Sequence, residues 1–222
     1  MYKIILLRHG ESIWNKKGLF TGWVDVGLSA AGKKEAVAAG KALQKAGLGF
    51  NYAFVSLLKR AIDTLAIVLV EMKIKNIPLK ESWRLNERHY GDLQGLSKEA
   101  MIKKYGARQV FLWRRSYATR PPGGESLQDV ERRVRPYWLK TIRPQIKKGK
   151  RIIIVASGNS LRALVKYLDK LSARQVADLN IPTGIPLIYE LNSRFQPLKH
   201  YYLADPKIWR AALAKVAHPK AG

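Results

Sequence analysis

The stretch Leu6-Leu7-Arg8-His9-Gly10-Glu11 joins the end of an apolar segment, residues 2–7, to an arginine, a histidine and a glycine. An apolar segment of this length is typical of a buried β-strand. In an open α/β sheet, ligand-binding side chains follow the carboxyl ends of the strands. A neutral imidazole there can act as a nucleophile, and the adjacent guanidinium can hold a phosphoryl group. Taken alone, however, a histidine at a strand end is more often a hydrogen-bonded structural residue.

The composition indicates a globular protein with its own core, since 47% of the 222 residues are hydrophobic and 26% are charged. We expect one domain over residues 1–222, with a tail from about residue 205 that forms a final helix or stays mobile. The chain has no cysteine, which excludes disulfide bonds, thiolate zinc sites and a cysteine nucleophile. Its four histidines form no His-x-x-x-His pair, so we expect no metal.

The net charge is +25, from 41 Lys and Arg against 16 Asp and Glu. Such a field attracts nucleic acid, acidic membranes or phosphorylated metabolites. The charges are dispersed, as at Lys16-Lys17 and Lys103-Lys104, which favours a solvated basic surface for most of the excess. We find no nucleic-acid motif and therefore expect no specific nucleic-acid partner. No segment has the length of a signal sequence or a membrane span, which favours a cytoplasmic protein without membrane association.

Short apolar segments alternate with longer amphipathic ones, which is typical of an α/β fold. We expect strands at residues 3–7, 52–56, 152–156 and 187–191, and helices at residues 32–46, 61–72, 98–105, 127–142 and 161–168. The strand at 152–156 should be buried on both faces. Ser126 and Asp129 can form a capping box for the helix at 127–142, and Pro136 should kink or break that helix near Arg135.

Three further segments carry groups suited to anion chemistry. Phe20-Thr21-Gly22-Trp23 offers hydroxyl and backbone N–H groups, although core packing explains the tryptophan equally well. Arg60 opens a predicted helix, where the N-terminus favours anions, although a surface arginine fits there too. In the block Trp83 to Gly91, the carboxylate of Glu87 lies between two arginines. This pattern suits a proton-transfer group beside anion-binding charges, or a salt-bridged loop.

These blocks, in this order, resemble the 2,3-bisphosphoglycerate-dependent phosphoglycerate mutases of the histidine phosphatase superfamily. The likeness covers nearly the whole chain and continues through the blocks at 113–117, 158–163 and 180–184. Arg8-His9-Gly10 alone marks only the superfamily, whereas the block at 83–91 is typical of the mutase branch. The resemblance implies a three-layer α/β sandwich whose mostly parallel central sheet is flanked by helices.

The resemblance also implies the interconversion of 3-phosphoglycerate and 2-phosphoglycerate, a step of glycolysis and gluconeogenesis, through a phosphohistidine primed by 2,3-bisphosphoglycerate. His9 would be the phosphorylated nucleophile, and Glu87 would accept and return the proton of the substrate hydroxyl. Arg8 and Arg60 would grip the transferring phosphoryl group. The rest of this small anionic substrate would be bound by Ser12, Asn15, Thr21, Gly22, Arg88, Tyr90, Lys98, Arg114, Arg115, Gly158 and Asn159. Cationic side chains would take the place of a metal, and the protein would form a homodimer.

One position departs from the family pattern inside the site. The family has a second histidine before Gly-Asn-Ser, where it donates a hydrogen bond to the phosphoryl group, and this chain has Ser157. Serine is shorter and cannot become cationic. Loss of one such donor costs roughly 10²–10³ in rate, so we expect ligand binding to survive better than turnover. Three explanations stay open: an engineered replacement, a natural relative with slow or lost activity, or a serine that suffices for a slower reaction.

A second departure is the loop at residues 118–124, where the family has a much longer insertion. A short loop should leave the site open and expose a phosphohistidine to water. Two alternatives stand beside the mutase: the short loop favours a bisphosphoglycerate phosphatase or synthase-like side activity, and Ser157 favours a catalytically weak phosphoglycerate-binding relative. Nucleic-acid association driven by the net charge would be a secondary property.

Overall fold

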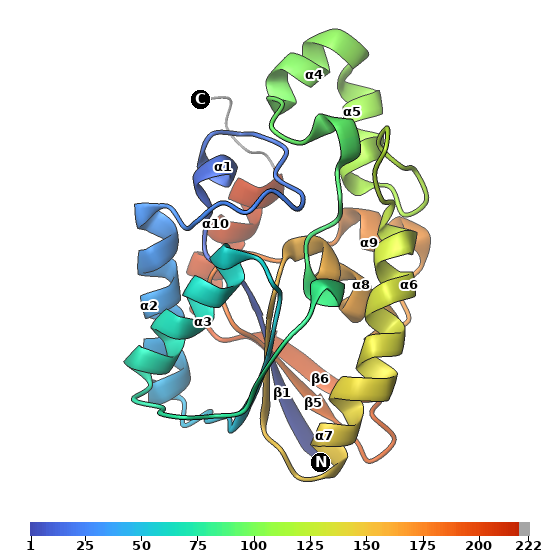
Figure 1. The fold of residues 1–222 in the computed structure, drawn as a ribbon. Coiled ribbons are helices and arrows are strands. Elements are labelled where there is room, and N and C mark those ends of the chain that lie inside the picture. The colour runs from blue at the N-terminus through green and yellow to red at the C-terminus, as the bar shows by residue number, and fades with distance from the viewer. Residues whose placement is uncertain (218–222) are drawn as a thin grey trace.

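The computed structural model describes residues 1–217 and contains a six-stranded sheet with helices on both faces (Figure 1). The strands, in the order β3-β2-β4-β1-β5-β6, are β3 (Leu79–Glu81), β2 (Tyr52–Val55), β4 (Ile152–Ala156), β1 (Tyr2–Arg8), β5 (Leu187–Leu191) and β6 (Pro197–Tyr202). Strands β1 to β4 run parallel to one another, and β5 and β6 pair antiparallel. The expected α/β sandwich with a mostly parallel sheet is confirmed.

All of the predicted helices are present, together with shorter ones that the sequence did not reveal. The helices are α1 (Ile13–Lys16), α2 (Ala30–Lys45), α3 (Lys59–Glu71), α4 (Lys98–Tyr105), α5 (Ala107–Arg115), α6 (Leu127–Tyr137), α7 (Arg143–Lys147), α8 (Gly158–Leu168), α9 (Ala173–Asp178) and α10 (Pro206–Ala217). The predictions missed α1, α5, α7 and α9, and also strands β3 and β6. These are short or mostly exposed elements, which carry little hydrophobic periodicity.

Alternate side chains of the central strands supply two separate cores. On β1, Ile4 and Leu6 pack on the face covered by α6 and α8, whereas Ile5 and Leu7 pack on the face covered by α2 and α3. Every residue of β4 is buried, as predicted, because this strand lies in the middle of the sheet with helices on both sides. These two cores make the sheet a rigid base for the residues at its edge.

The register of the parallel strands gathers three chain segments at one edge of the sheet. Arg8 pairs with Ala156 across β1 and β4, and the backbone N–H of His9 donates to the carbonyl of Ala156 at 3.1 Å. The N–H of Ser56, which follows β2, donates to the carbonyl of Val155 at 3.1 Å. Figure 1 shows α4 and α5 beyond this carboxyl edge. The strand ends therefore bring the candidate residues together.

Helix α6 confirms one local prediction and tests part of another. Ser126 and Asp129 form the predicted capping box. Of the two outcomes expected near Arg135, a break does not occur, because α6 continues through Pro136 and the π-helical turn Trp138–Ile142 follows it. A kink there stays a prediction. Proline lacks an N–H, so the helix loses one backbone hydrogen bond at this residue.

In the predicted tail, residues 206–217 form α10, and the ring of Trp209 lies 5.3 Å from that of Tyr202. The rest of that tail, residues 218–222, lies outside the described residues. A single domain over residues 1–222 stays a prediction. Within residues 1–217, no helix combines the length and the apolar character needed to cross a bilayer.

Candidate active site

A cavity of about 280 Å³ opens at the carboxyl edge of the sheet. Its polar lining comes from the end of β1, helices α1, α2 and α4, the segment at 21–22, the start of α3, the segment after β3, the end of α5, the start of α8 and the segment at 180–183. The cationic side chains that line it are Arg8, Arg60, Lys98, Arg114, Arg115 and Arg162. The carboxylates are Glu11, Glu35 and Glu87. This excess of positive charge suits an anionic ligand with more than one charged group.

His9 is held as a neutral imidazole whose Nε2 is unprotonated. Its Nδ1 lies 2.7 Å from the carbonyl oxygen of Gly10. Because a carbonyl only accepts, Nδ1 carries the proton and Nε2 keeps its lone pair. Burial, reinforced by the charges of Arg60 and Arg8, lowers the pKa of His9 well below its ordinary 6.5. The imidazole is therefore a ready nucleophile at neutral pH.

Two arginines flank this imidazole, of which Arg60 is buried and Arg8 is half-buried. The Nε of Arg60 donates to the histidine Nε2 at 3.2 Å, and its Nη2 donates to the carbonyl of Gly22 at 2.8 Å. Burial lowers the pKa of Arg60 to about 10, which leaves it charged at neutral pH. Arg8 donates from Nη1 to the carbonyl of Ile181 at 2.7 Å, and its Nε has no protein partner within residues 1–217. Both guanidiniums keep donors available for an oxyanion.

The Glu87 carboxylate is ionised and lines the same cavity. Burial alone would raise the pKa of Glu87, but hydrogen bonds from Asn159 and from the N–H of Arg88, with the charges of Arg8 and Arg60, lower it below its ordinary 4.5. The backbone N–H of Arg88 reaches Oε1 at 2.7 Å, and Asn159 donates to the same oxygen. An ionised carboxylate in this place can take a proton from a bound hydroxyl.

Arg162 was missed by the sequence predictions, although it lies in the quoted block at 158–163. Its Nη1 donates to Oδ1 of Asn159 at 2.6 Å, and its Nη2 donates to the carbonyl of Val176 at 2.6 Å. A guanidinium only donates, so Oδ1 of Asn159 must face Arg162 and the amide Nδ2 must face Glu87. The signal available in the sequence was the spacing of three residues between Asn159 and Arg162, which places them on one helix face.

A second group of predicted ligands comes from α4 and α5. A small core of Phe20, Leu93, Met101, Val110 and Trp113 supports these helices. Their lining residues are Lys98, Arg114 and Arg115, and the other predicted ligands that line the cavity are Asn15, Thr21, Gly22, Tyr90, Gly158 and Asn159. Burial, with the charges of Arg114 and Arg8, lowers the pKa of Lys98 to about 8.

Three predicted residues lie behind the lining. Ser12 caps α1, accepting from the N–H of Asn15 at 3.1 Å. Arg88 is fully buried and donates to the hydroxyl of Tyr90 at 3.2 Å. Ser157 is also fully buried, and its Oγ has no hydrogen-bond partner among residues 1–217. Direct contacts of these three residues with a ligand stay predictions.

The loop at 118–124 contributes no residue to the lining within the described chain. It packs against the segment that follows Glu87: the N–H of Asp92 donates to the carbonyl of Pro122 at 3.0 Å. Gly91 has a φ of +55°, and a Cβ there would collide with the same carbonyl. The short loop therefore seals against residues 89–92 and forms no part of the cavity wall.

Comparisons with known proteins agree with this fold. The family model described as the histidine phosphatase superfamily (branch 1) matches residues 4–201, and the chain belongs to that superfamily. A mycobacterial glucosyl-3-phosphoglycerate phosphatase complexed with VO3 has a TM-score of 0.77 and 27% identity, covering 91% of this chain and 97% of its own. An α-ribazole phosphatase from Shigella flexneri shares the fold, with a TM-score of 0.74 and 23% identity over 89% of this chain and 94% of its own.

The sequence comparison finds similarity to one particular class of enzyme in this superfamily. A 2,3-bisphosphoglycerate-dependent phosphoglycerate mutase from Borreliella afzelii (strain PKo) is 50% identical over 98% of this chain and 98% of its own length. The alignment spans 242 residues, more than the 222 of this chain, so that relative carries insertions.

Deprotonation of Lys98 should weaken oxyanion binding at high pH. Its ammonium loses the charge as the pH rises through about 8, so affinity for sulfate, whose own charge is constant, should fall. Loss of one charge-assisted hydrogen bond predicts a roughly tenfold weaker Kd between about pH 7 and pH 9, measurable by calorimetry. K98R should keep the affinity constant over this range, whereas K103R, on the exposed side of α4, should behave like the wild type. A wild-type Kd that does not change with pH would contradict the prediction.

Proposed function

We propose that this chain interconverts 3-phosphoglycerate and 2-phosphoglycerate, a step of glycolysis and gluconeogenesis, through phosphorylation of His9 by 2,3-bisphosphoglycerate. The observation that carries the proposal is the neutral Nε2 of His9 beside Arg60, in one cavity with the ionised Glu87. The 50% identity to the Borreliella afzelii mutase over 98% of both chains supports this substrate among the phosphate esters that the superfamily handles.

The chemistry follows from these groups. With a phosphoryl group on Nε2 of His9, the 2-hydroxyl of 3-phosphoglycerate attacks phosphorus, Glu87 takes the hydroxyl proton, and the N–P bond breaks with its electron pair returning to Nε2. The product is 2,3-bisphosphoglycerate, which turns over in the site. Nε2 then attacks the 3-phosphoryl group, Glu87 returns the proton to the departing oxygen, and 2-phosphoglycerate leaves. Arg8 and Arg60 neutralise the charge spread over the phosphoryl oxygens in both steps.

The remaining cations bind the rest of the substrate. Lys98, Arg114 and Arg115 approach from α4 and α5 and suit the second phosphate and the carboxylate. Ser12 and Arg88 act from behind the lining by holding Asn15 and Tyr90. No metal takes part in this scheme, and a cytoplasmic homodimer completes the proposal.

Incubation with 2,3-bisphosphoglycerate should add one phosphoryl group to His9, because its Nε2 is unprotonated and flanked by cations. Peptide mass spectrometry at neutral to alkaline pH reads the adduct. H9Q should give none, and H200Q, which alters a histidine on β6, should give the wild-type level. Tight ligand binding without any adduct would favour the phosphoglycerate-binding relative instead.

S157H should raise the mutase rate about a hundredfold, because it restores a donor to the phosphoryl group. Among residues 1–217 the buried Ser157 hydroxyl has no hydrogen-bond partner, which supports a role for this position in contact with a ligand. S157A is the matched control, since it changes the side chain without adding a donor, and should show no gain. Equal mutase rates for wild type and S157H would show that the serine is not what limits turnover.

A bisphosphoglycerate phosphatase activity is the second candidate, and the short loop at 118–124 favours it. Since this loop supplies no wall to the cavity, water reaches a phosphohistidine more easily. The ratio of phosphate release to isomerisation should therefore exceed that of a relative in which a long insertion occupies this loop, when both are assayed side by side. An equal or lower ratio would mean that other segments exclude water.

A further inference from the structure

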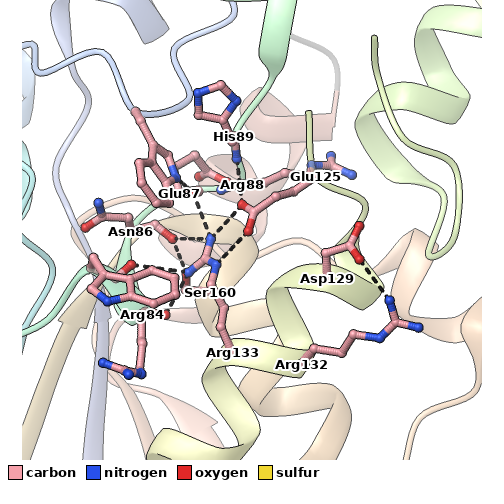
Figure 2. Close-up of polar contacts among 12 residues, drawn as sticks. Arg84, Asn86, Glu87, Arg88, His89, Glu125, Asp129, Arg132, Arg133 and Ser160 are labelled. Atoms are coloured by element: carbon pink, nitrogen blue, oxygen red, sulfur yellow. Dashed lines mark hydrogen bonds and ion pairs between the residues drawn. The ribbon is translucent and has the colours of Figure 1, made fainter. Parts of the chain in front are cut away.

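Arg133 on α6 does not line the cavity but lies directly behind the segment that carries Glu87 (Figure 2). Its Nη1 donates to the carbonyl of Arg84 at 2.7 Å. Its Nη2 donates to the carbonyls of Asn86 at 3.1 Å and Glu87 at 3.0 Å. The residue is 7% exposed, so these carbonyls have little access to water. One guanidinium thus satisfies several acceptors of one irregular segment, which only arginine has enough donors to do.

Glu125 holds the other side of this guanidinium and the far end of the same segment. Its Oε1 accepts from Nε of Arg133 at 2.9 Å, and its Oε2 accepts from Nη2 at 3.0 Å. The same Oε2 accepts from the backbone N–H of His89 at 2.9 Å. Figure 2 shows this paired arrangement. Residues 84–89 are therefore held at both ends by one ion pair.

The peptide bond between Glu87 and Arg88 links this ion pair to the cavity. Its carbonyl accepts from Arg133 and, at 2.6 Å, from Nε1 of Trp23. In a trans peptide the N–H points opposite to the C=O. Turning the carbonyl toward Arg133 therefore turns the N–H of Arg88 toward the Glu87 carboxylate, which accepts it at 2.7 Å. The orientation of this peptide plane, together with the hydrogen bond from Asn159, sets the place of the carboxylate.

We propose that Arg133, together with Glu125, is a positioning residue that orients the Glu87 carboxylate for proton transfer. The inference rests on the proposed role of Glu87 as the group that takes and returns the hydroxyl proton. Arg133 is not a catalytic residue, because it does not line the cavity and bonds only to Glu125 and to backbone carbonyls of the segment that carries Glu87. Substitution of Arg133 should therefore slow reactions in which Glu87 transfers a proton and have little effect on reactions that need no proton transfer.

The test compares R133M with R132M. Arg132 is the adjacent residue of α6, but its side chain is 64% exposed and pairs with Asp129 on the surface (Figure 2). R133M should lower kcat for isomerisation about 10²-fold, the effect of a misplaced catalytic group, with KM within a few-fold of wild type. R132M should keep both values. If R133M does not fold, R133K, which reaches fewer carbonyls, should still lower kcat about tenfold at unchanged KM.

Two further readouts separate positioning from general damage. Nitrophenolate leaves without being protonated, so hydrolysis of nitrophenyl phosphate should suffer far less than isomerisation in R133M. In an E87Q background, R133M should add less than about threefold, because its effect passes through the missing carboxylate. The inference would be overturned if R133M lost the same activity on phosphoglycerate and on nitrophenyl phosphate, or if R133M isomerised at the wild-type rate. It would also be overturned if the effects of R133M and E87Q were independent.

Failure of the proposed function would look different. A wild-type protein that hydrolyses phosphate esters without isomerising phosphoglycerate would refute the mutase. The Arg133 inference would then be judged on glycerol 3-phosphate against nitrophenyl phosphate, because an alkoxide leaving group still needs the proton from Glu87. R133M should lower the first hydrolysis about 10²-fold and the second much less, and an equal loss on both would overturn the inference.

Discussion

The hydrogen bond from Nδ1 of His9 to the carbonyl of Gly10 is the constraint on which the site depends. It settles which imidazole nitrogen holds the proton, and so leaves Nε2 unprotonated, where its lone pair accepts from Nε of Arg60. Strand β1 ends at Arg8, and the backbone N–H of His9 makes the last bond to β4 by donating to the carbonyl of Ala156. The carbonyl of Gly10 therefore lies beyond the sheet and can accept from the imidazole. The sheet register therefore prepares the nucleophile before any ligand arrives.

Burial at the same edge of the sheet destabilises the cationic side chains there, and a bound anion can offset this destabilisation. Burial lowers the pKa of Arg8, Arg60, Lys98 and Arg162, which shows that each charge is less stable here than in water. A multiply charged anion would reverse this destabilisation by pairing with several of them together. The arrangement is thus poor for the stability of the free protein and well suited to a bisphosphorylated metabolite.

The parts of the site that could be predicted are those that depend on local pattern. The strand at 152–156 and the capping box of Ser126 were found because burial and capping leave a signature within a few residues. Strands β3 and β6 were missed because their exposed positions carry no such signature. Arg133 was missed for another reason: its partners are mainly backbone carbonyls more than forty residues away, and a carbonyl is the same in every residue. Only the fold reveals that pairing.

The two halves of the proposed chemistry rest on different supports. The arginines proposed to bind the phosphoryl group lie at the end of β1 and the start of α3, whereas Glu87 lies on an irregular segment held by Arg133 of α6 and by Glu125. Glu125 comes directly after the short loop at 118–124, and its own N–H donates to the carbonyl of His89 at 2.8 Å. The ion pair and this backbone bond therefore separate Glu87 from the loop. If Glu87 is the proton-transfer group, a change in loop length leaves its support in place, and hydrolysis and isomerisation can then change independently.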